Sequence, residues 1–357
     1  MNSKAFLAAW KLAPKVPEPI LRGLANLAAD VAWLKRGKGV QRLENNYRRV
    51  RPELSDKHIR ALSRQGMRSY LRYFREAFTL PAVTGQQLAA RTRVVGAEHV
   101  RNALRDFGSP VIALSHSGNW DLAGAWAAAH LVPVLTVAEK LEPAEVYQAF
   151  VNFRNSLGIE VLGLGDNGVF DSLVAGAKRG GLIIPLLADR DLTYRGVEVE
   201  LLGHKARVAA GPAAVSLEAG VPLLLATIHY EKLNGKRRKA AGTPWGIVIT
   251  FIQVRNPEVN SFAIRDSATP VSTSAQNDDL SGVILRPTGS AESQKVNELT
   301  QAWVDQLGEF LKEHTEDWHM LQSVFVEDLD PTKYEATLQK ARLNTSQRPL
   351  PQNDEEE

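Results

Sequence analysis

His116 and Asp121 are the residues whose types and spacing most clearly allow catalysis. His116 follows the apolar run from Val111 to Leu114, and Asp121 comes five residues later, where an alanine-rich helical pattern begins. Catalytic groups on open α/β sheets gather at the carboxyl ends of strands, so this position favours an active site. A carboxylate can fix one ring nitrogen of a histidine and leave the other free to accept a proton. We therefore interpret His116 as a general base oriented by Asp121.

The spacing alone leaves a second interpretation open. The chain has 8 histidines and 40 acidic residues, and with these numbers about one pair five residues apart is expected by chance. His116 could equally be a turn residue whose hydrogen bonds cap the helix that follows it.

Cysteine is absent from the sequence, which excludes several classes of site. Disulfides, thiolate nucleophiles, iron–sulfur clusters and cysteine-ligated zinc all require it. The histidines show no paired ligand spacing apart from His314 and His319, so we expect no metal site. A direct transfer reaction that uses histidine as the base fits this composition better than a covalent thiol intermediate.

The His116 segment also resembles a known family. An apolar strand, His-Ser-Gly-Asn-Trp-Asp and a helix resemble the His-x4-Asp motif of the membrane-associated acyltransferases that include the lipid A late acyltransferases. The resemblance is closer still to the actinobacterial phosphatidylinositol mannoside acyltransferases, and it covers about residues 20–330. The other stretches that carry it are residues 43–50, 136–141, 188–193, 196–199 leading to 209–213, and 317–322.

This resemblance implies an O-acyltransferase that moves a long fatty acyl group from acyl-CoA to a mannose hydroxyl of a phosphatidylinositol mannoside. The acyl-CoA would be a co-substrate, and no cofactor is implied. His116 would remove the hydroxyl proton while Asp121 orients the imidazole, and base catalysis of this kind contributes on the order of 10²–10⁴-fold.

The resemblance implies roles for four further polar residues. Asp189 matches an acidic position near the catalytic pair, where we expect Glu in closer relatives, and Arg154, Arg195 and Glu218 match positions near the substrates. Ion pairs without any catalytic function are the alternative for each, and for Asp189 the partner would be Arg190 or Arg154.

The elements that must position these residues form an α/β pattern. Short apolar runs alternate with helical patterns, which predicts a mixed, largely parallel central sheet with helices on both faces. The expected strands are 92–95, 110–115, 132–138, 159–162, 182–187, 197–201, 222–230 and 246–254. The expected helices are 55–78, 97–106, 119–130, 143–157, 167–179, 209–219 and 291–314.

Residues 1–80 form a basic helical preface to the α/β domain, which we place at 81–330. They hold 17 Lys or Arg and 6 Asp or Glu, whereas the rest of the chain holds 26 and 34. One apolar stripe recurs at helical spacing, namely Ile20, Leu24, Leu27, Val31 and Leu34. Such a helix can lie on an anionic membrane surface or can pack on its own core.

We expect the protein to act as a peripheral protein at the cytoplasmic face of the inner membrane. The longest uncharged stretch, 122–138, has 17 residues and falls short of the roughly 20 that span a bilayer. Charges and prolines interrupt the first 35 residues, unlike a signal peptide.

Two segments are expected to be poorly ordered insertions: residues 234–243 predict a basic hairpin loop, and 265–282 predict a flexible loop. Residues 331–357 predict a polar C-terminal tail, which we expect to be disordered after Leu343.

Two other functions remain open. A non-catalytic lipid-binding protein would use the basic N-terminal region alone. A dinucleotide-binding oxidoreductase would use Gly163, Gly165 and Gly168, which fit Gly-x-Gly-x-x-Gly after an expected strand. Nucleic-acid binding has little support, because the basic residues are not interleaved with aromatic ones.

Overall fold

The computed structural model describes residues 10, 12–140, 142–191, 193, 195–254 and 290–346. A five-stranded sheet runs through its centre in the order β1-β9-β8-β2-β5, and all neighbours are parallel except β8 and β9. The parallel pair of β3 and β4 adjoins β5 through a bridge between Val134 and Ile183. The strands of these two sheets are β1 (Thr92–Val95), β2 (Val111–Leu114), β3 (Val134–Glu139), β4 (Ile159–Leu164), β5 (Ile184–Leu187), β8 (Leu223–Lys232) and β9 (Trp245–Gln253).

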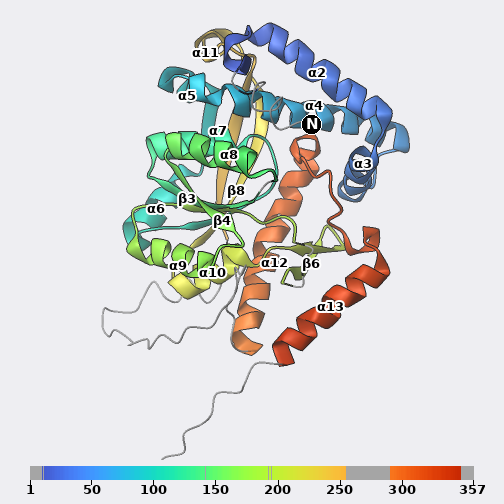
Figure 1. Cartoon of the computed structure of the whole chain (residues 1–357), viewed down its shortest axis with the longest axis vertical. Helices are drawn as coiled ribbons and strands as arrows, with labels where there is room; N and C mark the ends of the chain where they lie inside the picture. Colours follow the sequence, from blue (N-terminus) through green and yellow to red (C-terminus); the bar gives the residue numbers. More distant parts are fainter. Residues whose placement is uncertain are drawn as a thin grey trace, which may run out of the picture.

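Helices cover both faces of this sheet, which confirms the expected fold class (Figure 1). Alternate residues of β2 point to opposite sides: Val111 and Ala113 join one buried cluster, and Ile112 joins another. The first cluster packs under α9 (Val169–Arg179), α10 (Gly211–Ala219) and α12 (Ser290–Glu313). The second packs under α6 (Ala97–Phe107), α7 (Trp120–His130) and α8 (Ala144–Ser156). Both faces of the central strands are therefore apolar, as parallel sheets require.

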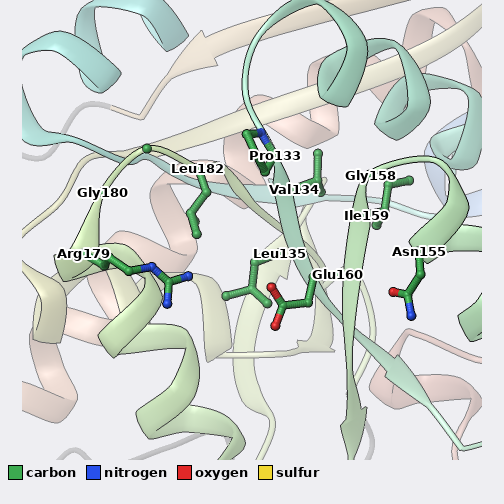
Figure 2. A pocket seen from close by; sticks show the side chains of 11 residues that line it. Pro133, Val134, Leu135, Asn155, Gly158, Ile159, Glu160, Arg179, Gly180 and Leu182 are labelled. Carbon is green, nitrogen blue, oxygen red and sulfur yellow. The ribbon is translucent and has the colours of Figure 1, made fainter.

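A surface pocket of about 440 Å³ lies where β3, β4 and β5 begin (Figure 2). Val134 and Ile159, at the first positions of β3 and β4, line it together with Leu182 just before β5. The pocket therefore opens at the amino edge of the parallel strands, whereas His116 follows the carboxyl end of β2.

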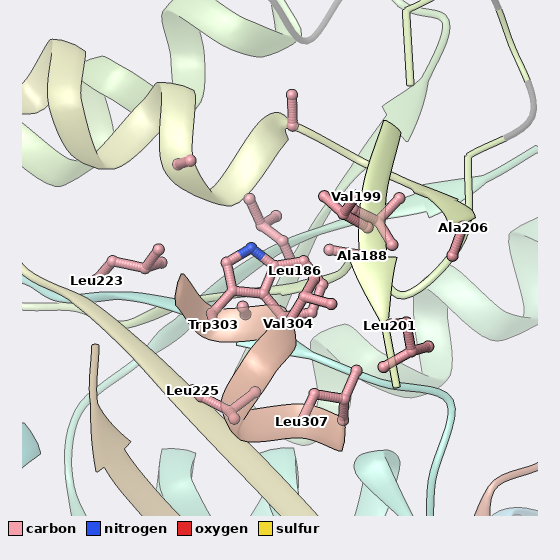
Figure 3. Close-up of a cluster of buried hydrophobic side chains, with 14 of the residues drawn as sticks. Leu186, Ala188, Val199, Leu201, Ala206, Leu223, Leu225, Trp303, Val304 and Leu307 are labelled. Atoms are coloured by element: carbon pink, nitrogen blue, oxygen red, sulfur yellow. The ribbon is translucent and has the colours of Figure 1, made fainter. Parts of the chain in front are cut away.

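Trp303 of α12 fills the centre of the first cluster (Figure 3). Its side chain is fully buried beside Leu186, Ala188 and Leu225, and Val304 and Leu307 extend the same contact along the helix. This helix also packs on β6 (Val197–Leu201), which pairs with β7 (His204–Val208) in an antiparallel hairpin. The sequence prediction included β6 but missed β7, whose charged residues hide the alternation of apolar ones.

The N-terminal helices pack on one another beside this sheet. In Figure 1, α2 (Glu18–Lys35) lies along the outside of α4 (Asp56–Thr79), and α3 (Lys38–Val50) lies at one end of the pair. Asp30 of α2 accepts hydrogen bonds from Arg64 and Arg68 of α4. These hydrogen bonds hold the pKa of the Asp30 carboxyl well below its ordinary value, so the carboxylate is charged at neutral pH.

The apolar stripe of α2 points away from α4 and the core. Its five side chains are between 42% and 68% exposed, namely Ile20, Leu24, Leu27, Val31 and Leu34. The interpretation that this stripe packs on the protein's own core is therefore wrong. The helix is attached instead through its other side, where Ala29 is buried and Trp33 Nε1 donates to Ser63 Oγ at 3.1 Å. Among the helices that the structure describes, none combines the length and the apolar character needed to cross a bilayer.

Helices also form in the expected hairpin loop and in the expected polar tail. Residues 235–241 form α11 (Gly235–Ala241), which ends at Gly242 in the left-handed conformation, so the prediction of a hairpin loop over 234–243 is wrong. The glycine after the basic run was the available signal, because it is a common helix C-cap. Residues 331–346 of the expected tail form α13 (Pro331–Ser346). The insertion at 265–282 lies outside the described residues, and the sequence prediction also missed α3 and the short α5 (Gly85–Arg91).

Gly66 tests the close contact between α3 and α4. A Cβ atom at Gly66 would lie 2.3 Å from Tyr47 Oη and 3.1 Å from its ring carbons, whereas a Cβ at Gly23 of α2 meets no atom within 4 Å. We expect Gly66→Ala to lower the free energy of unfolding by about 1–3 kcal/mol, because the Tyr47 ring must move. Gly23→Ala, the matched control, should raise it by about 0.5–1 kcal/mol through helix propensity. Urea denaturation measures both, and an equal effect of the two substitutions would contradict the packing described.

Candidate active site

The register of β2 and β5 brings His116 and Asp189 together. Leu114 pairs with Leu187 at the ends of these parallel strands, and His116 and Asp189 each lie two residues further along the chain. His116 Nδ1 lies 2.6 Å from Asp189 Oδ1, and the His116 backbone N–H donates to Asp189 Oδ2 at 3.0 Å. One carboxylate therefore holds both the ring and the main chain of the histidine.

The two partners differ in exposure. The Asp189 side chain is 1% exposed and that of His116 is 38% exposed. Burial alone would lower the pKa of His116, but the charge and hydrogen bond of Asp189 outweigh it and raise this pKa above its ordinary value. Burial opposes the charge of Asp189 too, yet the hydrogen bonds from His116 and Trp318 lower its pKa. The arrangement favours an ionised Asp189 and a proton on His116 Nδ1, which leaves Nε2 as the proton acceptor.

Asp121 has other partners than the expected histidine. Arg154 Nε donates to Asp121 Oδ1 at 2.8 Å, and the Tyr73 hydroxyl donates to Asp121 Oδ2 at 2.8 Å. The expectation that Asp121 orients His116 is corrected accordingly, because the contact with the imidazole belongs to Asp189. Asp121 lies in the first turn of α7, and its side chain faces α4 and α8 instead.

Arg154 and Asp121 form a largely buried ion pair beside the histidine. Their side chains are 16% and 2% exposed. Burial alone would lower the pKa of Arg154, but the Asp121 carboxylate outweighs it and raises this pKa further above its ordinary value. The Trp120 ring lies between the two pairs, with its centroid 5.6 Å from that of His116 and 3.9 Å from that of Tyr73.

Contacts with β8 and α4 fix the turn between His116 and Asp121. Gly118 has φ +58°, and a Cβ there would lie 2.6 Å from the Ile228 backbone oxygen. Asn119 caps α7, since its Oδ1 accepts from the Leu122 N–H at 2.9 Å while its Nδ2 donates to Glu76 Oε2 at 2.9 Å. Glu76 belongs to α4, so the N-terminal helices directly support the turn that carries His116.

Residues 317–320, which follow α12, complete the site. Trp318 Nε1 donates to Asp189 Oδ2 at 2.8 Å, and the His319 N–H donates to the His116 backbone oxygen at 2.7 Å. Helix α3 holds this segment from the outside, because Tyr47 donates to the Trp318 backbone oxygen and Asn46 donates to that of Met320. The motifs at 43–50 and 317–322 are thus in contact in the fold.

Asp317 and His319 of this segment are buried polar groups. Ser69 Oγ donates to Asp317 Oδ1 at 2.6 Å and lies 2.9 Å from His319 Nε2. Burial raises the pKa of Asp317 to about 6 and lowers that of His319 to about 3. His319 is therefore neutral at physiological pH and does not compete with His116 for a proton.

Two expected substrate residues lie elsewhere. Glu218 is near the C-terminal end of α10, 3.9 Å from Lys178 of α9. Both helices lead back to the amino edge of the sheet, so the fold separates Glu218 from His116. Arg195 lies in the turn before β6, where its N–H donates to Thr193 Oγ1 at 3.2 Å.

The Gly-x-Gly-x-x-Gly stretch does form a turn between β4 and α9. Gly165 and Gly168 have φ +99° and φ +72°, whereas Gly163 lies within β4. Asp166 in this turn pairs with Lys140. The acidic side chain of this turn is thus paired with Lys140, and Asp189, the acid about 20 residues further on, contacts His116.

Sequence reasoning missed the roles of Tyr73, Asn119 and Trp318. Trp318 lies within a stretch that carried the family resemblance, so the sequence marked this residue but did not indicate what it does. The sequence around Tyr73 and Glu76 showed only a helical pattern, which does not indicate their hydrogen bonds to Asp121 and Asn119. The equal offset of His116 and Asp189 beyond two apolar runs was a signal for their contact, because neighbouring parallel strands end at the same edge.

Comparisons with known proteins identify the family of this chain. Residues 3–244 match the model of a family described as bacterial lipid A biosynthesis acyltransferase. A phosphatidylinositol mannoside acyltransferase of Mycolicibacterium smegmatis is 32% identical over 346 residues, which cover 95% of this chain and 94% of the relative. A protein of the same name from Mycobacterium tuberculosis H37Rv is 31% identical over 333 residues, covering 92% and 90%. The chain therefore belongs to the bacterial lipid A biosynthesis acyltransferase family and is an acyltransferase.

Proposed function

We propose that this acyltransferase moves a long fatty acyl group from acyl-CoA to a mannose hydroxyl of a phosphatidylinositol mannoside. The observation that carries the proposal is the 2.6 Å contact between His116 Nδ1 and the buried Asp189, at the carboxyl edge of the sheet. The acceptor follows the names of the relatives, which are similar to this chain over nearly its whole length.

His116 acts as the general base in this proposal. Asp189 accepts a hydrogen bond from the Nδ1–H group, which keeps the proton on Nδ1. Nε2 can therefore take the proton of the attacking hydroxyl while the carbon–oxygen bond forms. The carbon–sulfur bond of the thioester then breaks, and the coenzyme A thiolate leaves and receives that proton. Asp189 stabilises the transient imidazolium, and no covalent acyl-enzyme is required.

Asp121 and Arg154 have a supporting role in the same proposal. Their ion pair, completed by Tyr73, joins α4, α7 and α8 beside the base. It also fixes Trp120, whose ring contacts that of Tyr73 and faces that of His116. The pair thereby keeps the first turn of α7 in place.

The central test measures thiol release from palmitoyl-CoA with and without mannosylated phosphatidylinositol. We expect acceptor-dependent release, and we expect His116→Ala to reduce it by about 10²–10⁴-fold because the base is lost. His130→Ala, an exposed histidine at the other end of α7, is the matched control and should keep wild-type activity. Equal release by the wild type and His116→Ala would refute the proposal and favour a non-catalytic lipid-binding protein.

The pH dependence tests the partner of the base. His116 must be neutral to accept a proton, so kcat/KM should fall as the pH drops through its pKa, which Asp189 holds above the ordinary value. Asp189→Asn removes that charge, and we expect the acid limb of the kcat/KM profile to move to lower pH while the maximal rate falls. An acid limb that stays in place in Asp189→Asn would mean that another group sets it.

We further propose that the apolar stripe of α2 docks the enzyme on an anionic membrane surface. The stripe is exposed over its whole length, and the exposed Lys35 and Lys38 lie at its C-terminal end. Apolar side chains that enter the lipid boundary, together with cations that attract anionic headgroups, are the two components of interfacial binding. Docking would bring the protein to the membrane that contains its glycolipid acceptor.

Vesicle flotation measures this docking. The double substitution Leu24→Ser and Leu27→Ser should weaken binding to vesicles containing phosphatidylglycerol about tenfold or more, because it removes apolar area that enters the lipid. Phe107→Ser removes an exposed apolar side chain from α6 and should leave binding unchanged. Higher salt should weaken the binding of all three proteins. Binding that ignores both the double substitution and the anionic lipid would argue against this surface.

A further inference from the structure

We propose that Trp318 is a positioning residue, whose indole N–H fixes the Asp189 carboxylate and thereby sets how strongly His116 holds a proton. The inference rests on the proposed function, in which His116 is the general base. Trp318 does not reach the imidazole through its indole N–H, because that donor is engaged with Asp189.

The geometry gives Asp189 three donors from two segments. Oδ1 faces His116 Nδ1 at 2.6 Å, while Oδ2 accepts from the His116 backbone N–H at 3.0 Å and from Trp318 Nε1 at 2.8 Å. Without the indole, the two donors that remain would both belong to His116, namely its backbone N–H and its ring Nδ1. Trp318 is therefore the contact that fixes the carboxylate relative to the rest of the protein, independently of the histidine.

The main chain around Trp318 keeps the indole in register with the His116 turn. The Gly118 N–H donates to the Asp317 backbone oxygen at 2.9 Å, and the His319 N–H donates to the His116 backbone oxygen at 2.7 Å. A bridge between Ser117 and Trp318 lies between these two hydrogen bonds. The fully buried indole moves only if this whole segment moves.

The chemistry of the donor suits this role. An indole N–H does not titrate in the physiological range, so it stabilises the Asp189 carboxylate equally at every working pH. A donor to an anion forms a strong, charge-assisted hydrogen bond. By drawing negative charge toward Oδ2, it weakens the attraction between Asp189 and the imidazolium and keeps the base ready to release its proton to the leaving thiolate.

Other charged groups also face His116 and would remain when the indole is changed. Glu139 at the end of β3 raises the pKa of His116, and Arg190, next to Asp189, lowers it. His319, whose backbone N–H donates to the His116 backbone oxygen, is itself neutral at physiological pH. A shift after changing Trp318 alone therefore reports the indole.

The test compares Trp318→Phe with Trp303→Phe. Both tryptophans are fully buried, but Trp303 Nε1 has no hydrogen-bond partner in the part of the chain that the structure describes. We expect Trp318→Phe to raise the pKa of His116 by on the order of half a unit, followed through its ring Cε1–H resonance. That resonance is assigned by its loss in His116→Ala, and Trp303→Phe should leave it unchanged.

Kinetics provide a second readout of the same variants. Trp318→Phe should lower kcat about tenfold with KM nearly unchanged and should move the acid limb of kcat/KM to higher pH. In an Asp189→Asn background the substitution should have no further effect on the His116 pKa, because the coupled carboxylate is gone. The titration needs no acyl transfer, so a failed enzyme assay and a failed positioning role give different results.

A final measurement leaves Trp318 intact and therefore does not depend on the folding of Trp318→Phe. The indole N–H resonance of Trp318 should move upfield in Asp189→Asn, since the charge-assisted hydrogen bond weakens. An unmoved indole resonance, an unmoved His116 pKa in folded Trp318→Phe, or an equal shift in Trp303→Phe would each overturn the proposal.

Discussion

The buried carboxylate of Asp189 is the constraint on which the rest of the site depends. An ionised group with a 1% exposed side chain is stable only if strong donors surround it, and His116 and Trp318 supply three. Those donors come from the turn after β2 and from residue 318, so a shift of either segment deprives the anion of at least one donor. The same requirement that stabilises the fold here also orients the proposed base.

This requirement explains why both ends of the chain belong to one structure. Helix α3 holds the segment of Trp318 through Tyr47 and Asn46, and α4 holds the turn after His116 through Glu76. The basic N-terminal region therefore has two different faces. Its inner face supports the site, and the apolar stripe of α2 faces outward.

The sequence predicted most of the strands and helices. All eight expected strands and all seven expected helices are present, with small differences at their ends, because apolar periodicity and local caps determine such elements. The predictions were wrong where local signals were ambiguous: β7 is too polar to alternate clearly, and the basic run of α11 concealed a helix. The motif around His116 was also readable, since its position after a buried strand follows from the same pattern.

The sequence by itself determined the fold class, the location of His116 at the end of a strand, and the family to which its motifs belong. Only the tertiary structure decided which carboxylate serves the histidine. Proximity along the chain suggested Asp121, but the first turn of α7 directs that side chain toward Tyr73 and Arg154. Strand register placed Asp189 beside His116, although 73 residues separate them, because a parallel pairing fixes partners by distance from the strand ends and not by distance in sequence.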